Sequence, residues 1–161
     1  MADSVSVFDI FKIGIGPSSS HTVGPMKAAH AFLQSAPDAA RYQVTLFGSL
    51  AWTGKGHGTD SAILLGLAGH QPEAIDPDAI DGILAALRDS ERYEIDFNYD
   101  RELDRHTNGM RFAAFDIDGN IVLEEEWFSL GGGFVARGDE PEPGVRDGEP
   151  RHLFTTSASL L

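Results

Sequence analysis

The sequence contains no cysteine. This absence excludes disulfides, thiolate nucleophiles, cysteine-ligated zinc and any iron–sulfur cluster held by this chain alone. Basic residues are also scarce, because 12 lysines and arginines stand against 25 aspartates and glutamates, which gives a net charge of −13. A chain this acidic repels nucleic acid and anionic lipid, so we expect neither as a partner.

No run of about 18 apolar residues is present, so no membrane-spanning helix is expected. The N-terminus carries Asp3 and Asp9 and lacks a basic start, which does not match a signal peptide, and we expect a cytoplasmic protein. The rest of the composition indicates a folded domain, since 42% of the 161 residues are hydrophobic and 23% are charged. This length is typical of one domain.

The order of predicted elements indicates an α+β fold, with a mixed sheet and helices packed on it. Strands are expected at 4–11, 42–50, 92–97, 110–117, 121–128 and 135–137. Helices are expected between Pro25 and Ala36, over 61–69 and over 77–88. Residues 12–25 and 53–58 are rich in glycine and are predicted to be loops. We expect residues 1–137 to form the domain and the acidic, Pro/Gly-rich residues 138–161 to form a linker or surface loop.

Two of these loops share one design, in which a strand is followed by a glycine-rich turn, a polar cluster and the start of a helix. The first loop contains Ser18, Ser19, Ser20, His21 and Thr22, and the second contains Lys55, His57 and Thr59 among three glycines. Free backbone N–H groups at a helix start can hold an anion such as a carboxylate.

Helix capping accounts for much of the first loop, but it does not explain three consecutive serines. It also does not explain why Lys55 and His57 stand between glycines. His57 is therefore the candidate acid/base residue, since imidazole titrates near neutrality. For His21, covering an apolar helix face and serving the site are equally open interpretations.

Two later segments are weaker candidates. His106 and Asn108 belong first to a turn before a strand, and a ligand role is the alternative. Ser129, Gly131 and Gly132 begin a glycine-rich break, which indicates either a bulge or the close approach of a partner domain. No H-x-x-x-H, Walker or G-x-S-x-G pattern is present, so no metal site is expected in this chain.

Four motifs, taken in order, resemble one family. VFDIFKIGIGPSSSHTVGPMKAA, GSLAWTGKGHGTD, HTNGMRF and FSLGGGF are similar to the N-terminal (beta) domain of single-chain bacterial iron–sulfur L-serine dehydratases, over residues 4–134. In that family a larger, mostly helical alpha domain follows and holds the cysteines for a [4Fe–4S] cluster. The resemblance therefore implies that this chain is a beta domain whose alpha domain is missing, and that the full-length enzyme is a homodimer. It also implies a fold similar to the allosteric substrate-binding domain of D-3-phosphoglycerate dehydrogenases.

The implied reaction converts L-serine to pyruvate and ammonia without pyridoxal phosphate. Iron with an open coordination position can act as a Lewis acid on the substrate hydroxyl. His57, on the K-G-H-x-T-D motif, is implied as the acid/base or orienting group, and residues 18–22 would border the interdomain cleft and bind the substrate carboxylate. The isolated chain is expected to be inactive.

Two other functions fit the same residues: a regulatory domain that binds an amino acid as an effector, and an assembly domain without chemistry. If a cleft is shared with a catalytic partner, the segments 18–22, 54–59 and 129–133 should converge on one side of the fold.

Overall fold

The computed structural model describes residues 14–138 and 140, whose five strands form one mixed sheet in the order β2-β1-β3-β4-β5. β1 (Arg41–Leu46) runs parallel to β2 (Tyr93–Phe97). The other neighbours are antiparallel, namely β1 with β3 (Gly109–Phe115), β3 with β4 (Ile121–Gly131) and β4 with β5 (Phe134–Arg137). The predicted α+β class with a mixed sheet is therefore confirmed.

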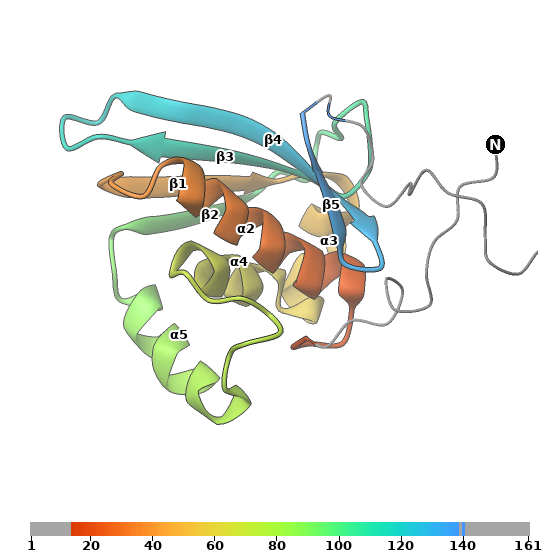
Figure 1. Cartoon of the computed structure of the whole chain (residues 1–161). Helices are drawn as coiled ribbons and strands as arrows, with labels where there is room; N and C mark the ends of the chain where they lie inside the picture. Colours follow the sequence, from red (N-terminus) through yellow and green to blue (C-terminus); the bar gives the residue numbers. More distant parts are fainter. Residues whose placement is uncertain (1–13, 139, 141–161) are drawn as a thin grey trace, which may run out of the picture.

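The helices cover one face of this sheet (Figure 1). They are α2 (Gly24–Ser35), α3 (Gly48–His57), α4 (Thr59–Leu67) and, packed outside α4, α5 (Ile80–Arg88). None of the helices in the described part of the chain has the length and apolar character needed to cross a membrane. The strand predicted at 4–11 and most of the predicted linker lie outside the described residues, and the proposed domain division stays an expectation.

The sheet has one buried and one polar face because its strands alternate apolar and polar residues. In β1, Tyr42, Val44 and Leu46 are fully buried against the helices. On the opposite face, Arg41 forms an ion pair with Glu94 at 2.8 Å. The open face is therefore held by charge pairs across strands, while the core lies between the sheet and the helices.

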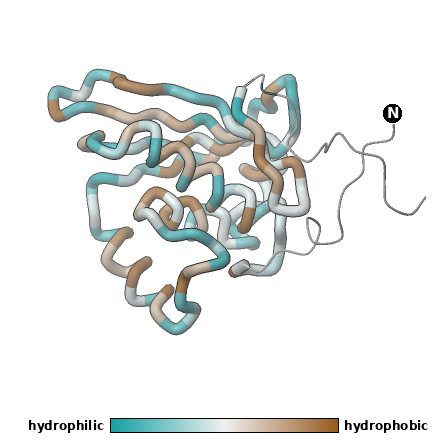
Figure 2. Tube along the Cα trace, in the orientation of Figure 1, coloured by the Kyte–Doolittle hydropathy of each residue, from teal (hydrophilic) through white to brown (hydrophobic). Residues whose placement is uncertain are grey.

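Two of the helices follow their sequence patterns closely. Residues 62–67 of α4 are apolar on all sides, and the helix is buried as predicted (Figure 2). The predicted helix 77–88 forms as a 3-10 turn (Pro77–Ala79) followed by α5. The side chain of Asp76 accepts a hydrogen bond from the Asp78 N–H and caps the turn. α5 buries Leu84 against α4, as its apolar spacing predicts.

The prediction of a loop at 53–58 is wrong, because these residues belong largely to α3. The strand predicted to reach Leu50 ends at Leu46, and the chain turns directly into this helix. Leu50 and Ala51 anchor α3 in the core, which outweighs the low helix propensity of its glycines. The helix ends at His57, and the next residue, Gly58, caps it with a φ of 68° in the left-handed region that glycine adopts without steric cost.

Two smaller expectations also need correction. The predicted loop at 12–25 contains one turn of π-helix, η1 (Ser19–Val23), which continues directly into α2 and is capped by Ser18. The break predicted at Ser129 comes later, because Ser129 pairs with Val135 and β4 continues to Gly131. The positive φ angles of Gly132 and Gly133 then make the turn into β5.

Candidate functional site

The centre of the site is a pair of histidines from the two polar segments that the sequence singled out. His21 lies in η1 and His57 is the last residue of α3, and their ring centroids are 4.9 Å apart at an interplanar angle of 41°. Hydroxyl groups tie the two segments together in both directions. Thr22 Oγ1 donates to the His57 carbonyl at 3.1 Å, and Thr59 Oγ1 donates to the His21 carbonyl at 2.6 Å. These two hydrogen bonds fix the backbone of His21 relative to that of His57.

The ring of His57 is oriented by its own helix. Its Nδ1 lies 2.9 Å from the carbonyl oxygen of Thr53, one turn earlier. Because a carbonyl oxygen only accepts hydrogen bonds, Nδ1 must carry a hydrogen. In the neutral ring, Nε2 then has the free lone pair. His57 is thus set up to accept a proton at Nε2.

The ring of His21 has a hydroxyl partner at each nitrogen. Nδ1 lies 2.9 Å from Ser20 Oγ, and Nε2 lies 3.2 Å from Ser49 Oγ. Burial, followed by the neighbouring His57, lowers the pKa of His21, and a hydrogen bond to the backbone of Ser49 partly offsets this. His21 therefore favours the neutral state.

The third predicted segment joins the same cluster through Ser129. The hydroxyl of this fully buried residue donates to the Ser20 carbonyl at 2.7 Å. Gly24 permits the approach, since a Cβ at that position would collide with Ser129 Oγ. The segments 18–22, 54–59 and 129–133 thus meet through His57, Thr59 and Ser129.

Asn108 lies in the bend before β3 and supports Ser129. Its Nδ2 donates to the Ser129 carbonyl at 3.1 Å, and its own N–H donates to His106 Nδ1 at 3.0 Å. Asn108 is buried, and its Oδ1 has no hydrogen-bond partner within the described residues. His106 therefore holds Asn108, and Asn108 holds the backbone of Ser129 in β4.

Other predicted site residues lie apart from the histidine pair. The Nζ of Lys55 lies 5.1 Å above the ring of Phe97, so Lys55 is directed toward β2. Ser19 is exposed, and its side chain makes no hydrogen bond to any residue that the structure describes. Gly131 and Gly132 lie at the turn between β4 and β5, beyond Ser129. Thr22 and Thr59 use their hydroxyls on backbone carbonyls, so both have a structural task.

Two residues of the site were missed by the sequence analysis, Ser49 and Thr53. Together with His57 they are spaced four residues apart, which places all three on one face of α3. This spacing was readable in the motif GSLAWTGKGHGTD, but only if the segment is assigned as a helix. The glycine-rich composition favoured a loop, and in a loop this four-residue spacing has no meaning.

Two small pockets adjoin the histidine pair. His57, Gly58 and Pro17 help to line one of about 330 Å³, whose inner wall is apolar residues of α4 and α5. Ser49, Trp52 and Tyr99 help to line the other, of about 350 Å³. Both volumes lie at the small end of the range for ligand sites. They suit a small molecule, and the His21 ring contacts one residue of each pocket, His57 and Ser49.

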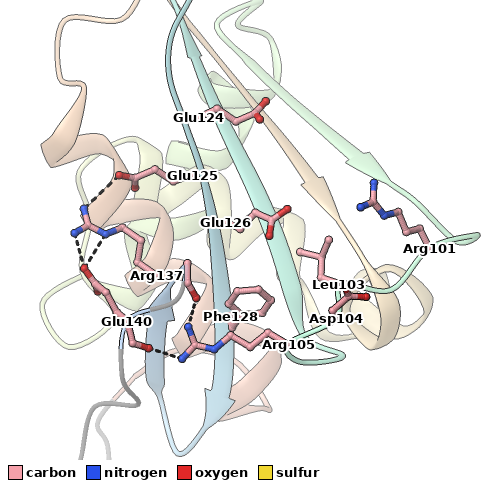
Figure 3. A pocket seen from close by; sticks show the side chains of 11 residues that line it. Arg101, Leu103, Asp104, Arg105, Glu124, Glu125, Glu126, Phe128, Arg137 and Glu140 are labelled. Carbon is pink, nitrogen blue, oxygen red and sulfur yellow. Dashed lines mark hydrogen bonds and ion pairs between the residues drawn. The ribbon is translucent and has the colours of Figure 1, made fainter.

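A larger open pocket of about 830 Å³ lies on the polar side of the sheet (Figure 3). Arg137 points toward Glu125 and Glu140, with ion pairs of 3.3 and 2.5 Å. Arg105 donates to the backbone carbonyls of Gly138 and Glu140. Arg137 is thus paired with Glu125 and Glu140, and the pocket contains no histidine, so the acid/base chemistry is not assigned to it.

The described residues do not offer a metal centre. No group of three or more His, Asp or Glu side chains in this part of the chain could hold a metal ion, and the sequence has no cysteine. Iron–sulfur clusters are held mainly by cysteine thiolates. The residues present therefore do not fit the cluster that the resemblance implies.

The fold and site define the chain as an α+β domain with a histidine and hydroxyl site at one end of its helical layer. A profile of the serine dehydratase beta chain family matches residues 6–140, and the chain belongs to this family.

Its relatives include the L-serine dehydratase of Streptomyces coelicolor, which is 43% identical over an alignment of 183 positions that covers 98% of this chain and 40% of the relative. L-serine dehydratase 2 of Escherichia coli is 42% identical, over 97% of this chain and 39% of the relative. The L-serine dehydratase of Mycobacterium bovis is 47% identical, over 82% of this chain and 33% of the relative. The chain thus spans two fifths or less of the length of these relatives.

Proposed function

We propose that this chain is the beta part of an L-serine dehydratase, a lyase that converts L-serine to pyruvate and ammonia, and that His57 is its acid/base residue. The observation that carries the proposal is the His57 ring. Its Nδ1 faces the Thr53 carbonyl, which leaves Nε2 as an acceptor beside a small pocket. The names of the relatives supply the substrate.

The chemistry requires a base at Cα of serine, because that proton must leave before or with the β-hydroxyl. His57 Nε2 can accept it in the neutral state of the ring. The adjacent His21 favours the neutral state, so it adds no fixed positive charge that would oppose protonation of His57. After elimination, the aminoacrylate product hydrolyses to pyruvate and ammonia without enzyme help.

The polar segment around His21 supports binding of the substrate carboxylate. Ser18 and Ser20 place neutral hydroxyl groups beside the His21 ring, where they orient it, so the segment that borders the substrate carboxylate carries no negative charge of its own. Thr22, Thr59 and Asn108 hold the backbone of this segment. Lys55 lies over Phe97 and is not included in the substrate contacts.

The [4Fe–4S] cluster of our proposal belongs to an alpha domain that corresponds to the additional length of the relatives. The described residues cannot ligate it, so no step is assigned to a metal on this chain. Residues 1–137 would form the beta domain, and residues 138–161 would lead to the alpha domain. We propose that the complete enzyme is a cytoplasmic homodimer, in which the alpha domain closes the histidine site.

Pyruvate formation by two proteins tests this function. The 161-residue chain, incubated anaerobically with iron and sulfide, should show no visible cluster absorbance and form no pyruvate from L-serine. The complete protein, treated identically and without pyridoxal phosphate, should become coloured and form pyruvate. A coloured, active preparation of the chain alone would contradict the proposal that the cluster is held by the alpha domain. A complete protein that binds L-serine but forms no pyruvate would instead favour the effector-binding domain.

A further inference from the structure

A chain of hydrogen-bonding groups runs through His21 and ends at Ser49. Ser18 Oγ accepts a hydrogen bond from the His21 backbone N–H at 3.2 Å and lies 3.3 Å from Ser20 Oγ. Ser20 Oγ lies 2.9 Å from His21 Nδ1, and Nε2 lies 3.2 Å from Ser49 Oγ. Every group in this chain is a hydroxyl or an imidazole, so one choice of tautomer fixes the direction of all the hydrogen bonds.

We propose that His21 carries its ring hydrogen on Nε2 and donates it to Ser49, so that Ser49 is a positioning residue for His21 and presents its own hydroxyl hydrogen to a carboxylate ligand. This inference rests on the proposed function, because the carboxylate is that of the amino-acid substrate. It adds Ser49 to the residues that contact the substrate, and it assigns the ring hydrogen of His21 to Nε2.

The direction follows from the start of η1. Ser18 Oγ already accepts one hydrogen from the backbone, so its own hydrogen is free to go to Ser20. In this arrangement Ser20 donates to Nδ1, and the ring hydrogen lies on Nε2. In this direction, each hydroxyl before the ring accepts one hydrogen bond and donates one, which strengthens the series cooperatively.

The series leaves the hydrogen of Ser49 unused. The hydroxyl of Ser49 makes no other hydrogen bond to a residue that the structure describes. Its backbone N–H is already taken by Thr107, whose carbonyl oxygen and Oγ1 lie 3.0 and 3.2 Å away. Ser49 also lines the 350 Å³ pocket beside Trp52 and Tyr99. The free hydrogen therefore lies where a small ligand can reach it.

The pocket of Ser49 also contains a cation. Arg101 lines it together with Asp100 and Glu102, and no ion pair of these three side chains occurs among the described residues. A carboxylate at Ser49 therefore has a positive charge in the same pocket. Because His57 lines the 330 Å³ pocket, the substrate has to extend from Ser49 past the His21 ring for its Cα to reach His57 Nε2.

Nitrogen NMR of the histidine rings in the 161-residue chain tests the tautomer directly. At a pH where His21 is neutral, the wild-type ring should show hydrogen on Nε2, with the signal assigned by its loss in His21→Asn. Ser49→Ala should remove this preference, and Ser49→Thr should retain it. Thr53→Ala is the matched control, because it removes a hydroxyl one turn further along α3 that bonds the Ser49 carbonyl and should leave the His21 ring unchanged. Hydrogen on Nδ1 in the wild type, or no response to Ser49→Ala, would overturn the proposal.

Steady-state kinetics of the complete protein tests the ligand contact. Ser49→Ala should raise KM for L-serine about tenfold or more and lower kcat much less, as expected for the loss of a hydrogen bond to a charged group. Ser49→Thr should restore most of the affinity. An unchanged KM in an active Ser49→Ala enzyme would reject the ligand contact and leave the proposed function standing. In contrast, failure of the proposed function would appear as missing turnover in the wild type, whatever tautomer His21 adopts.

Discussion

His21 shows how a single residue can link the site to the stability of the fold. Burial and the neighbouring His57 lower its pKa below the ordinary value of 6.5. The unfolded chain therefore binds a proton at a higher pH than the folded chain, and stability falls as pH drops through that window.

We expect the free energy of unfolding to decrease as pH falls below about 6.5, because the folded state resists protonation of His21. In His21→Gln this part of the pH dependence should be absent. Chemical denaturation of both proteins across the range, compared as a difference, isolates the contribution of His21 from those of other histidines. Parallel pH profiles for the two proteins would show that His21 titrates as an ordinary surface histidine.

Helix α3 marks the limit of prediction at the scale of elements. α5 and α4 could be predicted, because apolar spacing and composition are properties of the local sequence. α3 could not, because three glycines in six residues are typical of a loop, and the helix depends on tertiary burial of Leu50 and Ala51. The prediction of the site was limited for the same reason. His57 and the serines of η1 could be proposed from residue type, whereas Ser49 and Thr53 become visible only once the helix places them beside His57.

Two neighbouring glycines provide a matched test of this helix. Gly58 has a φ of 68°, whereas Gly56 has an ordinary helical conformation, and a Cβ added at either position would meet no atom within 4 Å. Gly58→Ala should destabilise the chain by about 1–2 kcal/mol through the left-handed backbone. Gly56→Ala should be neutral or stabilise by up to about 1 kcal/mol through helix propensity. Urea unfolding measures the change in the free energy of unfolding for each variant. Equal effects of the two substitutions would contradict a helix that includes Gly56 and is capped by a left-handed Gly58.

The site around His21 and His57 lies next to an exposed aromatic patch on the surface of the molecule. The Trp52 side chain on α3 is 69% exposed and meets the ring of Tyr99, which is 44% exposed, at a centroid distance of 5.1 Å. Large apolar surface beside a functional site is typical of an interface. The additional length of the relatives makes the proposed alpha domain its expected partner.

Tryptophan fluorescence can detect this contact, because the second tryptophan, Trp127, is already buried. The emission of Trp52, obtained as the difference between wild type and Trp52→Phe, should shift to shorter wavelength in the complete protein relative to the 161-residue chain. Trp127→Phe should retain this shift. If Trp52 emits at the same wavelength in both proteins, the alpha domain does not cover this end of α3.

If this chain supplies the acid/base residue of serine dehydration, two histidine substitutions should differ sharply in their effect on kcat. In the complete protein, His57→Asn should lower kcat by about two orders of magnitude or more, as expected for a lost acid/base group, with little change in thermal stability. His70→Asn is the control, since His70 follows α4 and lies outside the site. It should leave kcat nearly unchanged. Equal and mild effects of the two substitutions would contradict the account, because His57 would then be no more than the last residue of a helix.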